Sequence, residues 1–488
     1  MSDAPVSGES SRNCMPFGAM DMEPILLLCL SLLAHGAEAA CRDARFEGTV
    51  LPLRVQQLVV APPTRSPAAN RLRFRHDVSL TVPVAVGAPP QNVTMVLDTG
   101  SELSWLLCNG SRVPSTPPQP QAPAAFNGSA SSTYAAAHCS SSPECQWRGR
   151  DLPVPPFCAG PPSNSCRVSL SYADASSADG VLAADTFLLG GAPPVRALFG
   201  CITSYSSSST ADGNGNGNDA SATNSSEAAT GLLGMNRGSL SFVTQTGTLR
   251  FAYCIAPGDG PGLLVLGGDG DGAALSAAPQ LNYTPLIEMS QPLPYFDRVA
   301  YSVQLEGIRV GAALLPIPKS VLAPDHTGAG QTMVDSGTQF TFLLADAYAP
   351  LKGEFLNQTS ALLAPLGEPD FVFQGAFDAC FRASEARVAA ATASQLLPEV
   401  GLVLRGAEVA VGGEKLLYMV PGERRGEGGS EAVWCLTFGN SDMAGMSAYV
   451  IGHHHQQNVW VEYDLQNSRV GFAPARCDLA TQRLAARA

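Results

Sequence analysis

Two short segments of the chain repeat each other and constrain its fold more than any other feature. MVLDTGS occupies residues 95–101 and MVDSGT occupies residues 333–338. Each follows an apolar run that is typical of a strand, and each is matched far downstream by two apolar residues and a glycine, at residues 232–234 and 450–452. This duplication predicts two similar lobes, each contributing the aspartate of its segment to a shared interface.

The two aspartates, Asp98 and Asp335, suit the hydrolysis of peptide bonds without a metal, a cofactor or a covalent intermediate. Two carboxyl groups that share one proton are pushed to different pKa values, because like charges at close range cannot both ionise. One group then acts as the general base that activates a water molecule, and the other protonates the carbonyl oxygen. The pair titrates as a unit.

Three pairs of residues beside the aspartates support this chemistry. The first pair has no side chain, so the two turns can approach closely. The second pair carries hydroxyls that can bond to the opposite turn, and the third can donate to the outer carboxylate oxygens. In that order the pairs are Gly100 and Gly337, Thr99 and Ser336, and Ser101 and Thr338.

Composition favours an all-β protein of two lobes. The chain has 488 residues, too many for one ordinary core. It is rich in glycine and proline, and only 15% of its residues are charged, which favours short strands joined by turns over helices. The formal net charge of -13 argues against a nucleic-acid partner, because phosphate binding requires a basic surface.

The chain divides into a leader, a connecting segment, two lobes and a tail. Residues 1–40 contain an apolar run too short to span a bilayer, followed by small residues spaced for signal-peptidase cleavage, so we expect a secretory signal; a buried helix is the alternative. Residues 41–77 are basic and weakly periodic and are expected to be a short propeptide or linker. The N-terminal lobe is expected over residues 78–285, the C-terminal lobe over 286–478, and a polar tail over 479–488.

Cysteine and asparagine patterns indicate an oxidising compartment. Three of the 13 cysteines lie in or beside the leader, and the even number that remains fits a disulfide framework, while the lack of any Cys-x-x-Cys pair disfavours a zinc ribbon. We therefore expect a glycoprotein of the secretory pathway without a membrane anchor, located in the endoplasmic reticulum lumen or outside the cell. The glycosylation acceptors are Asn92, Asn109, Asn127, Asn224, Asn282 and Asn357.

The chain resembles the pepsin-like aspartic proteases. Within that family it looks like the plant nepenthesin-like type, and most like the subgroup named for promotion of cell survival. The resemblance covers residues 72–484, and its most specific stretches are VTMVLDTGSELSWL, VSLSYADASSADG, TGLLGMNRGSLSFV and IGHHHQQNVWVEYDLQNSRVGFAPARC. It implies two β-rich lobes with a cleft between them, in which Asp98 and Asp335 match the catalytic pair.

The resemblance also assigns a flap, which is a hairpin that closes over the substrate. Tyr172 matches the flap tyrosine, and Trp105 matches the indole that hydrogen-bonds it. Ala173 and Ala175 replace the two glycines of the usual plant flap sequence, Tyr-Gly-Asp-Gly-Ser. We expect these alanines to stiffen the flap and to narrow the specificity.

Two disulfide expectations follow for the cysteines. By resemblance, Cys380 and Cys435 pair within the second lobe. Residues 108–166 resemble the insertion of the nepenthesin-type enzymes and contain five cysteines, so at least one must pair outside the segment, and Cys201 is the nearest candidate. The other pairings are left open, because sequence alone does not define connectivity.

The function implied is that of an aspartic endopeptidase with an acidic pH optimum. The expected partners are protein or peptide substrates bound in extended form, and the expected state is a monomer with no cofactor. The subgroup suggests a role in restraining programmed cell death. The rival interpretation is a catalytically silent relative that binds a protein, as protease-like xylanase inhibitors do, and the intact Asp-Thr-Gly and Asp-Ser-Gly triplets argue against it.

Four local patterns complete the analysis. The best helical pattern covers residues 345–358, and residues 204–229 have low complexity and are expected to form a loop. Glu102 places a third carboxylate near the cleft or its rim. Residues 453–455 are three consecutive histidines, whose side chains point in different directions and therefore rarely share one metal ion.

Overall fold

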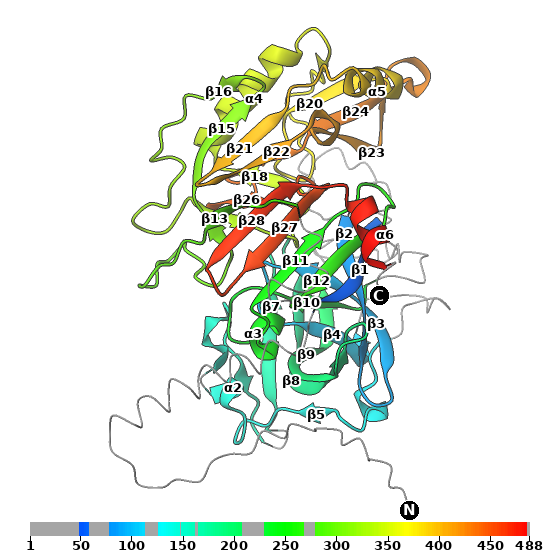
Figure 1. Cartoon of the computed structure of the whole chain (residues 1–488), viewed down its shortest axis with the longest axis vertical. Coiled ribbons are helices and arrows are strands. Elements are labelled where there is room, and N and C mark those ends of the chain that lie inside the picture. The colour runs from blue at the N-terminus through cyan, green and yellow to red at the C-terminus, as the bar shows by residue number, and fades with distance from the viewer. Residues whose placement is uncertain are drawn as a thin grey trace, which may run out of the picture. The chain divides into compact units, whose positions relative to one another are not determined.

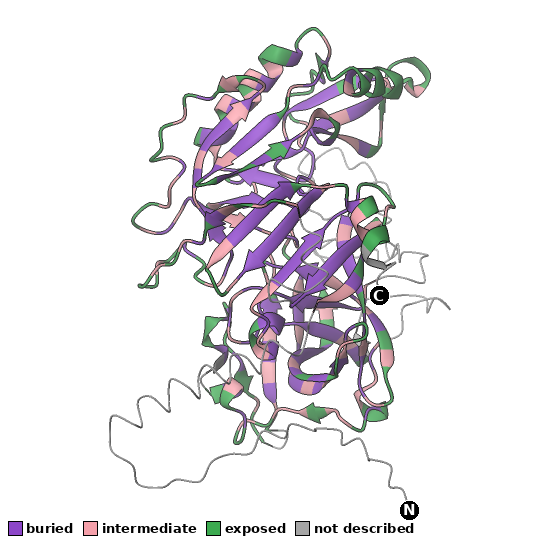
Figure 2. Ribbon diagram, in the orientation of Figure 1, coloured by how far each residue is buried: buried purple, intermediate pink, exposed green. Residues whose placement is uncertain are grey.

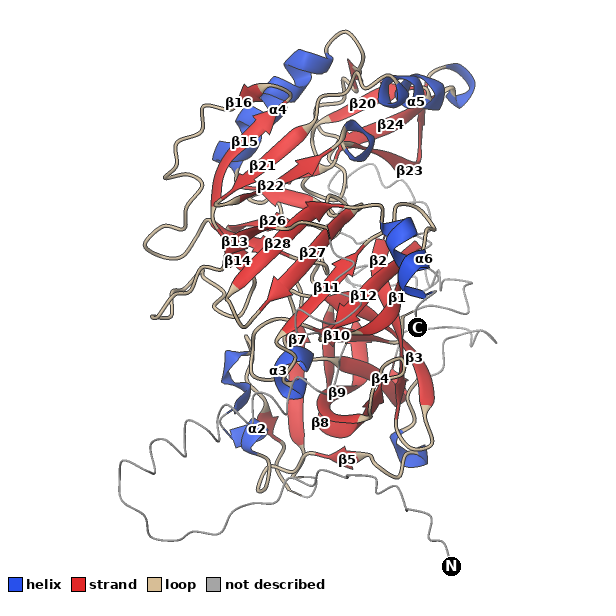
Figure 3. Cartoon of the chain, viewed as in Figure 1, coloured by secondary structure: helices blue, strands red, loops and turns tan. Residues whose placement is uncertain are grey.

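The computed structural model describes residues 48–57, 78–112, 125–146, 148–161, 164–206, 229–267 and 279–485. Strands dominate these residues, as Figure 3 shows, and the all-β prediction is confirmed. The expected secretory signal at residues 1–40 and almost all of the low-complexity segment lie outside the described residues.

One sheet of fifteen strands carries the segment of Asp98 and extends to the C-terminal strands (Figure 1). In order of pairing, its strands are β13 (Asn282–Pro285), β28 (Arg469–Pro474), β27 (Val459–Asp464), β11 (Arg250–Cys254), β12 (Gly262–Leu266), β1 (Thr49–Gln57), β2 (Val78–Val86), β3 (Gln91–Asp98), β10 (Gly231–Gly234), β4 (Trp105–Arg112), β9 (Val195–Ser206), β8 (Ser177–Leu188), β7 (Cys166–Ser171) and β6 (Phe157–Cys158), with β5 (Ala135–Ala136) on β8.

Three smaller sheets form the second lobe. The first contains β14 (Ser302–Val303), β17 (Gln331–Val334), β26 (Ala448–Ile451), β18 (Thr341–Leu343) and β25 (Phe438–Asn440). The second contains β16 (Ala313–Leu314), β15 (Leu305–Val310), β21 (Val400–Leu404) and β22 (Ala407–Val411). The third contains β19 (Ala364–Pro365), β20 (Cys380–Ala383), β24 (Glu431–Leu436) and β23 (Leu417–Arg425).

Helices are short and few in the described residues. Residues 345–358 were predicted to be helical, and α4 covers this segment, burying Ala347, Leu351 and Phe355 as the apolar period requires. The α-helices are α2 (Pro143–Gln146), α3 (Phe242–Thr246), α4 (Ala345–Thr359), α5 (Glu385–Ala393) and α6 (Cys477–Ala485). The 3-10 helices are η2 (Gly128–Ala130), η3 (Arg148–Asp151), η6 (Gly413–Lys415) and η7 (Glu427–Gly429).

The core includes residues of the strands that carry the repeated segments and of the strands that pair with them, and Figure 2 shows that strands supply most of the buried residues. β3 lies parallel to β10, with Leu97 opposite Leu233, and β17 lies parallel to β26, with Val334 opposite Ile451. Strands that are buried on both faces read as apolar runs instead of alternating patterns. Each downstream apolar-apolar-glycine segment therefore pairs with its own aspartate-bearing strand.

Two segments outside the two expected lobes take part in regular structure. The expected propeptide or linker, residues 41–77, contains β1, which pairs with β12 on one side and β2 on the other. The alternating pattern of β1 is short, and the arginines and prolines in and around it make the strand hard to predict from sequence. Residues 479–485 of the expected tail continue the helix α6, which begins at Cys477 and packs on β12.

Candidate active site

The two aspartates lie at the ends of buried strands. β3 ends at Asp98, and β17 ends one residue before Asp335. Each aspartate is followed by a tight turn, in which the carboxylate accepts from the backbone N–H two residues on, at 2.8 Å for Asp98 and 2.9 Å for Asp335. The same local geometry is thus built twice, once on each parallel pair of strands.

The turns are joined by a reciprocal pair of hydrogen bonds. The Thr99 N–H donates to the Ser336 hydroxyl at 3.0 Å, and the Ser336 N–H donates to the Thr99 hydroxyl at 2.9 Å. Both side chains are buried, so these bonds are shielded from competing water. They hold the two strand ends in one defined separation.

Close approach of the turns depends on two glycines. A Cβ built on Gly337 would lie 2.3 Å from Asp98 Oδ1, and one built on Gly100 would lie 2.9 Å from Asp335 Oδ1. Real Cβ atoms do not come this near to other heavy atoms, so any larger residue would push the carboxyl groups apart.

The carboxyl groups are held symmetrically from outside. Ser101 donates its hydroxyl to Asp98 Oδ2 at 2.5 Å, and Thr338 donates to Asp335 Oδ2 at 2.6 Å. Charge-assisted bonds of this kind orient each carboxyl group. The remaining oxygens are the ones that face the backbone of the opposite turn.

The electrostatic environment of Asp98 and Asp335 favours a state in which the two carboxyl groups hold one proton between them. Burial raises the pKa of Asp98, and the neighbouring charge of Asp335 and a hydrogen bond between the two carboxyls raise it further. The donors from Ser101 and Gly100 act in the opposite direction. A protonated carboxyl beside an ionised one is the arrangement that combines an acid and a base.

The hairpin of β7 and β8 carries Tyr172 at its turn. The Trp105 indole N–H donates to the Tyr172 hydroxyl at 2.6 Å. The negative charge of Asp98 contributes to a raised Tyr172 pKa, after burial, so the tyrosine lies within electrostatic range of the aspartate. Tyr172, the expected flap tyrosine, is therefore held at the turn of this hairpin by the Trp105 indole.

Comparisons with known proteins identify the family. The aspartic proteinase PCS1 of Arabidopsis thaliana is 51% identical over 437 residues, which are 89% of this chain and 89% of that protein. The chain belongs to the plant pepsin-like aspartic proteases. The family's nepenthesin-2 of Nepenthes gracilis is 30% identical over 83% of this chain and 79% of its own length. As a member of this family the chain is an aspartic-type endopeptidase.

Two family models and one solved structure agree with this protease fold. The model described as xylanase inhibitor N-terminal matches residues 81–268, and the one described as xylanase inhibitor C-terminal matches residues 300–474. The solved structure "Crystal structure of edgp" aligns with a TM-score of 0.57 over 90% of this chain and 97% of that one. At 19% identity this likeness shows the fold alone.

Glu102, which the sequence analysis expects near the cleft or its rim, is a buried carboxylate four residues after Asp98 in this aspartic protease. Its side chain is buried, and Oε1 accepts from the Leu240 N–H at 2.8 Å, while Oε2 has no hydrogen-bond partner. Burial raises the pKa of Glu102 to about 7. Position 102 therefore joins the turn after Asp98 to residues 238–240, because the segment after β10 folds over it.

The three consecutive histidines contact different partners. His455 lies between the hydroxyls of two threonines, at 2.7 and 2.8 Å, His454 Nε2 lies 3.0 Å from the Lys415 carbonyl, and His453 Nε2 lies 3.4 Å from the Val78 carbonyl. The backbone of this run bonds to the loop after the second catalytic turn. The three rings do not converge on one point.

Five disulfides connect the described residues. The expected bond between Cys380 and Cys435 is present, and Cys108 pairs outside the cysteine-rich segment with Cys201. The bond between Cys254 of β11 and Cys477 of α6 anchors the C-terminal helix to the sheet. The complete set is Cys108–Cys201, Cys139–Cys158, Cys145–Cys166, Cys254–Cys477 and Cys380–Cys435.

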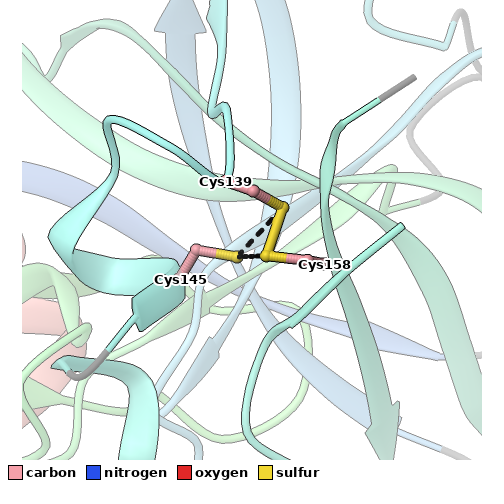
Figure 4. A group of neighbouring side chains, drawn as sticks. All are labelled: Cys139, Cys145 and Cys158. Carbon is pink, nitrogen blue, oxygen red and sulfur yellow. Dashed lines mark hydrogen bonds between the residues drawn. A yellow bond between two sulfur atoms is a disulfide. The ribbon is translucent and has the colours of Figure 1, made fainter. Parts of the chain in front are cut away.

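Two of the disulfides cross in the insertion, Cys139–Cys158 and Cys145–Cys166, and Figure 4 shows three of their four cysteines. Cys145 Sγ lies 3.9 Å from Cys139 Sγ and 3.8 Å from Cys158 Sγ. Three sulfurs at this spacing resemble a metal-ligand set, but each is bonded to another sulfur, and metal binding requires thiolates. Since Cys166 begins β7, the crossing anchors the base of the flap hairpin.

The sequence analysis missed one side chain beside the flap. The Tyr205 ring centroid lies 5.7 Å from that of Trp105, and the Tyr205 hydroxyl interacts with Ser176, four residues after the flap tyrosine. No sequence signal marked this residue, because it begins the low-complexity segment 204–229. Trp105 is therefore flanked by two tyrosines.

Proposed function

We propose that Asp98 and Asp335 are the catalytic pair of this endopeptidase. A water molecule between the carboxyls loses a proton to the ionised aspartate and attacks the scissile carbonyl, whose oxygen receives the proton of the other aspartate. As the tetrahedral intermediate breaks down, the aspartate that took the proton of the water passes it to the departing amine nitrogen. The C–N bond breaks, and the other aspartate regains its proton from a hydroxyl of the intermediate. The substrate lies extended beneath the Tyr172 flap, which excludes bulk water.

The reciprocal bonds between Thr99 and Ser336 carry this proposal. They hold two buried carboxyls, which are far apart in sequence, close enough to share a hydrogen bond. Burying two carboxyls side by side costs free energy, and nothing in ordinary strand packing requires it. Such an arrangement is expected where the raised pKa has a catalytic use.

The rival function is that of a silent protein that binds another protein through the same fold. The observation that supports this rival is that the family models that match the chain are described as xylanase inhibitor domains. The complete set of donors around both aspartates favours catalysis, because a binding protein has no need to preserve them.

Cleavage of a denatured protein between pH 3 and 6 tests the two functions. We expect pepstatin to block cleavage and Asp335→Asn to reduce kcat/KM by roughly 10³-fold or more, since an amide cannot serve as base or acid. Asp370→Asn, which changes an exposed carboxylate, is the control and should keep full activity. Unchanged cleavage by Asp335→Asn would refute the catalytic pair.

We also propose that the enzyme acts in the secretory pathway, in the endoplasmic reticulum lumen or outside the cell, as a monomeric glycoprotein made from a zymogen. Five disulfides and exposed asparagines at positions 92, 109, 282 and 357 support an oxidising compartment. In the described parts of the chain, no helix combines the length and apolar character needed to cross a bilayer. A role in restraining programmed cell death rests on the subgroup resemblance.

A further inference from the structure

Three buried polar side chains lie behind the catalytic turns, on segments that are distant in sequence. Tyr253 comes from β11, Tyr463 from β27, and Gln456 from the loop between β26 and β27. All three are fully buried, so each polar atom must find its hydrogen-bond partner inside the protein. Their partners connect them to both catalytic turns.

The amide of Gln456 has only one orientation that satisfies its neighbours. Nε2 donates to the Ile451 carbonyl at 2.8 Å and to the Asp335 carbonyl at 3.2 Å. Two carbonyl acceptors require the amide nitrogen on that side, which turns Oε1 toward the Tyr253 hydroxyl. Tyr253 must therefore donate its only proton to Gln456.

The direction of the remaining bonds follows from one proton per hydroxyl. The Tyr253 oxygen lies 3.0 Å from the Tyr463 oxygen, and since Tyr253 has given its proton to Gln456, Tyr463 donates to Tyr253. Tyr463 also shares a hydrogen bond with the Thr99 hydroxyl. Because Tyr463 has given its own proton to Tyr253, its oxygen accepts from Thr99 in this bond. The other contact of that hydroxyl, with the Val334 carbonyl, is long at 3.4 Å.

These bonds close a ring through the peptide group between Asp335 and Ser336. Its carbonyl accepts from Gln456, and its N–H donates to the hydroxyl of Thr99, which in turn donates to Tyr463. Both ends of this peptide plane are therefore held. Rotation of the plane would break the bond from Ser336 that joins the two turns.

The tyrosine at the centre of the ring is also packed rigidly. The Tyr463 ring stacks on Phe251 with centroids 4.5 Å apart and lies 4.3 Å from the Tyr301 ring. Aromatic packing of this kind leaves the hydroxyl little freedom to move. The hydrogen-bond ring is thus a stiff support for the turns.

We propose that Gln456, Tyr253 and Tyr463 are positioning residues, which set the separation of the two catalytic carboxyls by holding the peptide plane between Asp335 and Ser336. This inference rests on the catalytic pair proposed above. None of the three faces the substrate side of the turns, since each contacts the backbone or the hydroxyl behind them. Their effect should therefore appear in turnover more than in substrate binding.

Three substitutions that keep the shape of each side chain test the role: Gln456→Met, Tyr253→Phe and Tyr463→Phe. We expect kcat to fall roughly 10- to 100-fold with KM changed less than about 3-fold, because small misplacements of reacting groups cost rate. The alkaline limb of the kcat/KM profile should move to lower pH, since the charge of a more distant Asp335 raises the pKa of Asp98 less. Tyr348→Phe removes a buried hydroxyl in α4 that bonds Asp378, and it is the control for stability loss alone.

The variant Gln456→Glu separates positioning from folding. When protonated, its carboxyl can donate to one carbonyl and accept from Tyr253, but when ionised it repels the Asp335 carbonyl. We expect its activity to approach that of the wild type at the lowest pH and to fall more steeply than that of Gln456→Met as pH rises. Equal urea midpoints for the phenylalanine variants and the Tyr348→Phe control would show that folding is not the cause.

Either of two results would overturn the inference. One is an unchanged kcat and pH profile in all three shape-preserving variants. The other is a loss of activity that follows the loss of stability, with Tyr348→Phe losing as much. An active Asp335→Asn variant would refute the catalytic pair itself. An inactive Asp335→Asn variant, together with full activity of Gln456→Met, Tyr253→Phe and Tyr463→Phe, would refute the positioning role alone.

Discussion

At the scale of single residues, the flap turn contains an uncommon backbone conformation. Ala175 has φ of +64°, in the left-handed region that disfavours side chains. Asp174 stabilises the same turn by accepting from the N–H and the hydroxyl of Ser176, at 2.9 and 2.6 Å. The flap therefore holds a defined turn with an alanine where a glycine would sit without strain.

Replacing the flap alanines one at a time should separate strain from stiffness. Ala175→Gly relieves a left-handed cost of about 1–2 kcal/mol and should not lower the free energy of unfolding, whereas Ala173→Gly should lower it by about 0.5–1 kcal/mol. Both variants should cleave a wider set of peptides than the wild type, as measured with a peptide library. Identical cleavage patterns would show that the alanines do not restrict the specificity.

At the scale of elements, β1 joins two parts of the large sheet. It pairs with β12 through Leu51 opposite Leu264 and with β2 through Val55 opposite Leu80. The side chains of Leu51 and Leu53 are buried, so removal of the strand exposes apolar surface and leaves backbone groups unpaired on both neighbours. A segment that the sequence analysis assigned to a propeptide or linker thus contributes to the core.

Truncation tests the contribution of β1. We expect a chain that begins at residue 48 to fold with nearly the stability of the longer one, whereas a chain that begins at residue 78 should be less stable by several kcal/mol and prone to self-association through its open strand edges. Urea unfolding and light scattering measure the two effects. Equal behaviour of the two truncated chains would mean that β1 is dispensable and consistent with a released propeptide.

At the scale of the whole molecule, the buried Glu102 and the half-buried His454 oppose each other in the pH dependence of stability. The pKa of Glu102 is raised by burial from 4.5 to about 7, so its contribution to stability is complete below 4.5 and is lost as pH rises through 7. The pKa of His454 is lowered by burial from 6.5 to about 4, so its contribution is complete above 6.5 and is lost as pH falls through 4. Between pH 4.5 and 6.5 the stability lost at Glu102 and the stability gained at His454 with rising pH nearly cancel.

Single substitutions should remove this compensation. As pH rises from 4.5 to 7, the unfolding free energy of Glu102→Gln should increase relative to that of the wild type by up to roughly 3 kcal/mol. As pH rises from 4 to 6.5, that of His454→Gln should decrease relative to the wild type by up to roughly 3 kcal/mol. Urea titrations across this range measure both slopes. Parallel curves for the wild type and both variants would show that neither group titrates as described.

Local patterns in the sequence were enough to predict much of this protein. The duplicated Asp-Thr-Gly and Asp-Ser-Gly segments predicted two lobes, and the period of residues 345–358 predicted α4, because turn chemistry and helical spacing are local properties. The donors around Asp98 and Asp335 also follow from residues next to them in the chain. These features depend on neighbours within a few positions.

Only the tertiary structure decided the features that depend on distant segments. The ring through Gln456, Tyr253 and Tyr463 joins three segments and both turns, and no spacing in the sequence relates them. The burial of Glu102 and the pairing of β1 likewise depend on which strands lie side by side. The sequence therefore determined the chemistry of the site, whereas long-range strand pairing decided how that chemistry is held, because contacts across a fold leave no periodic trace along the chain.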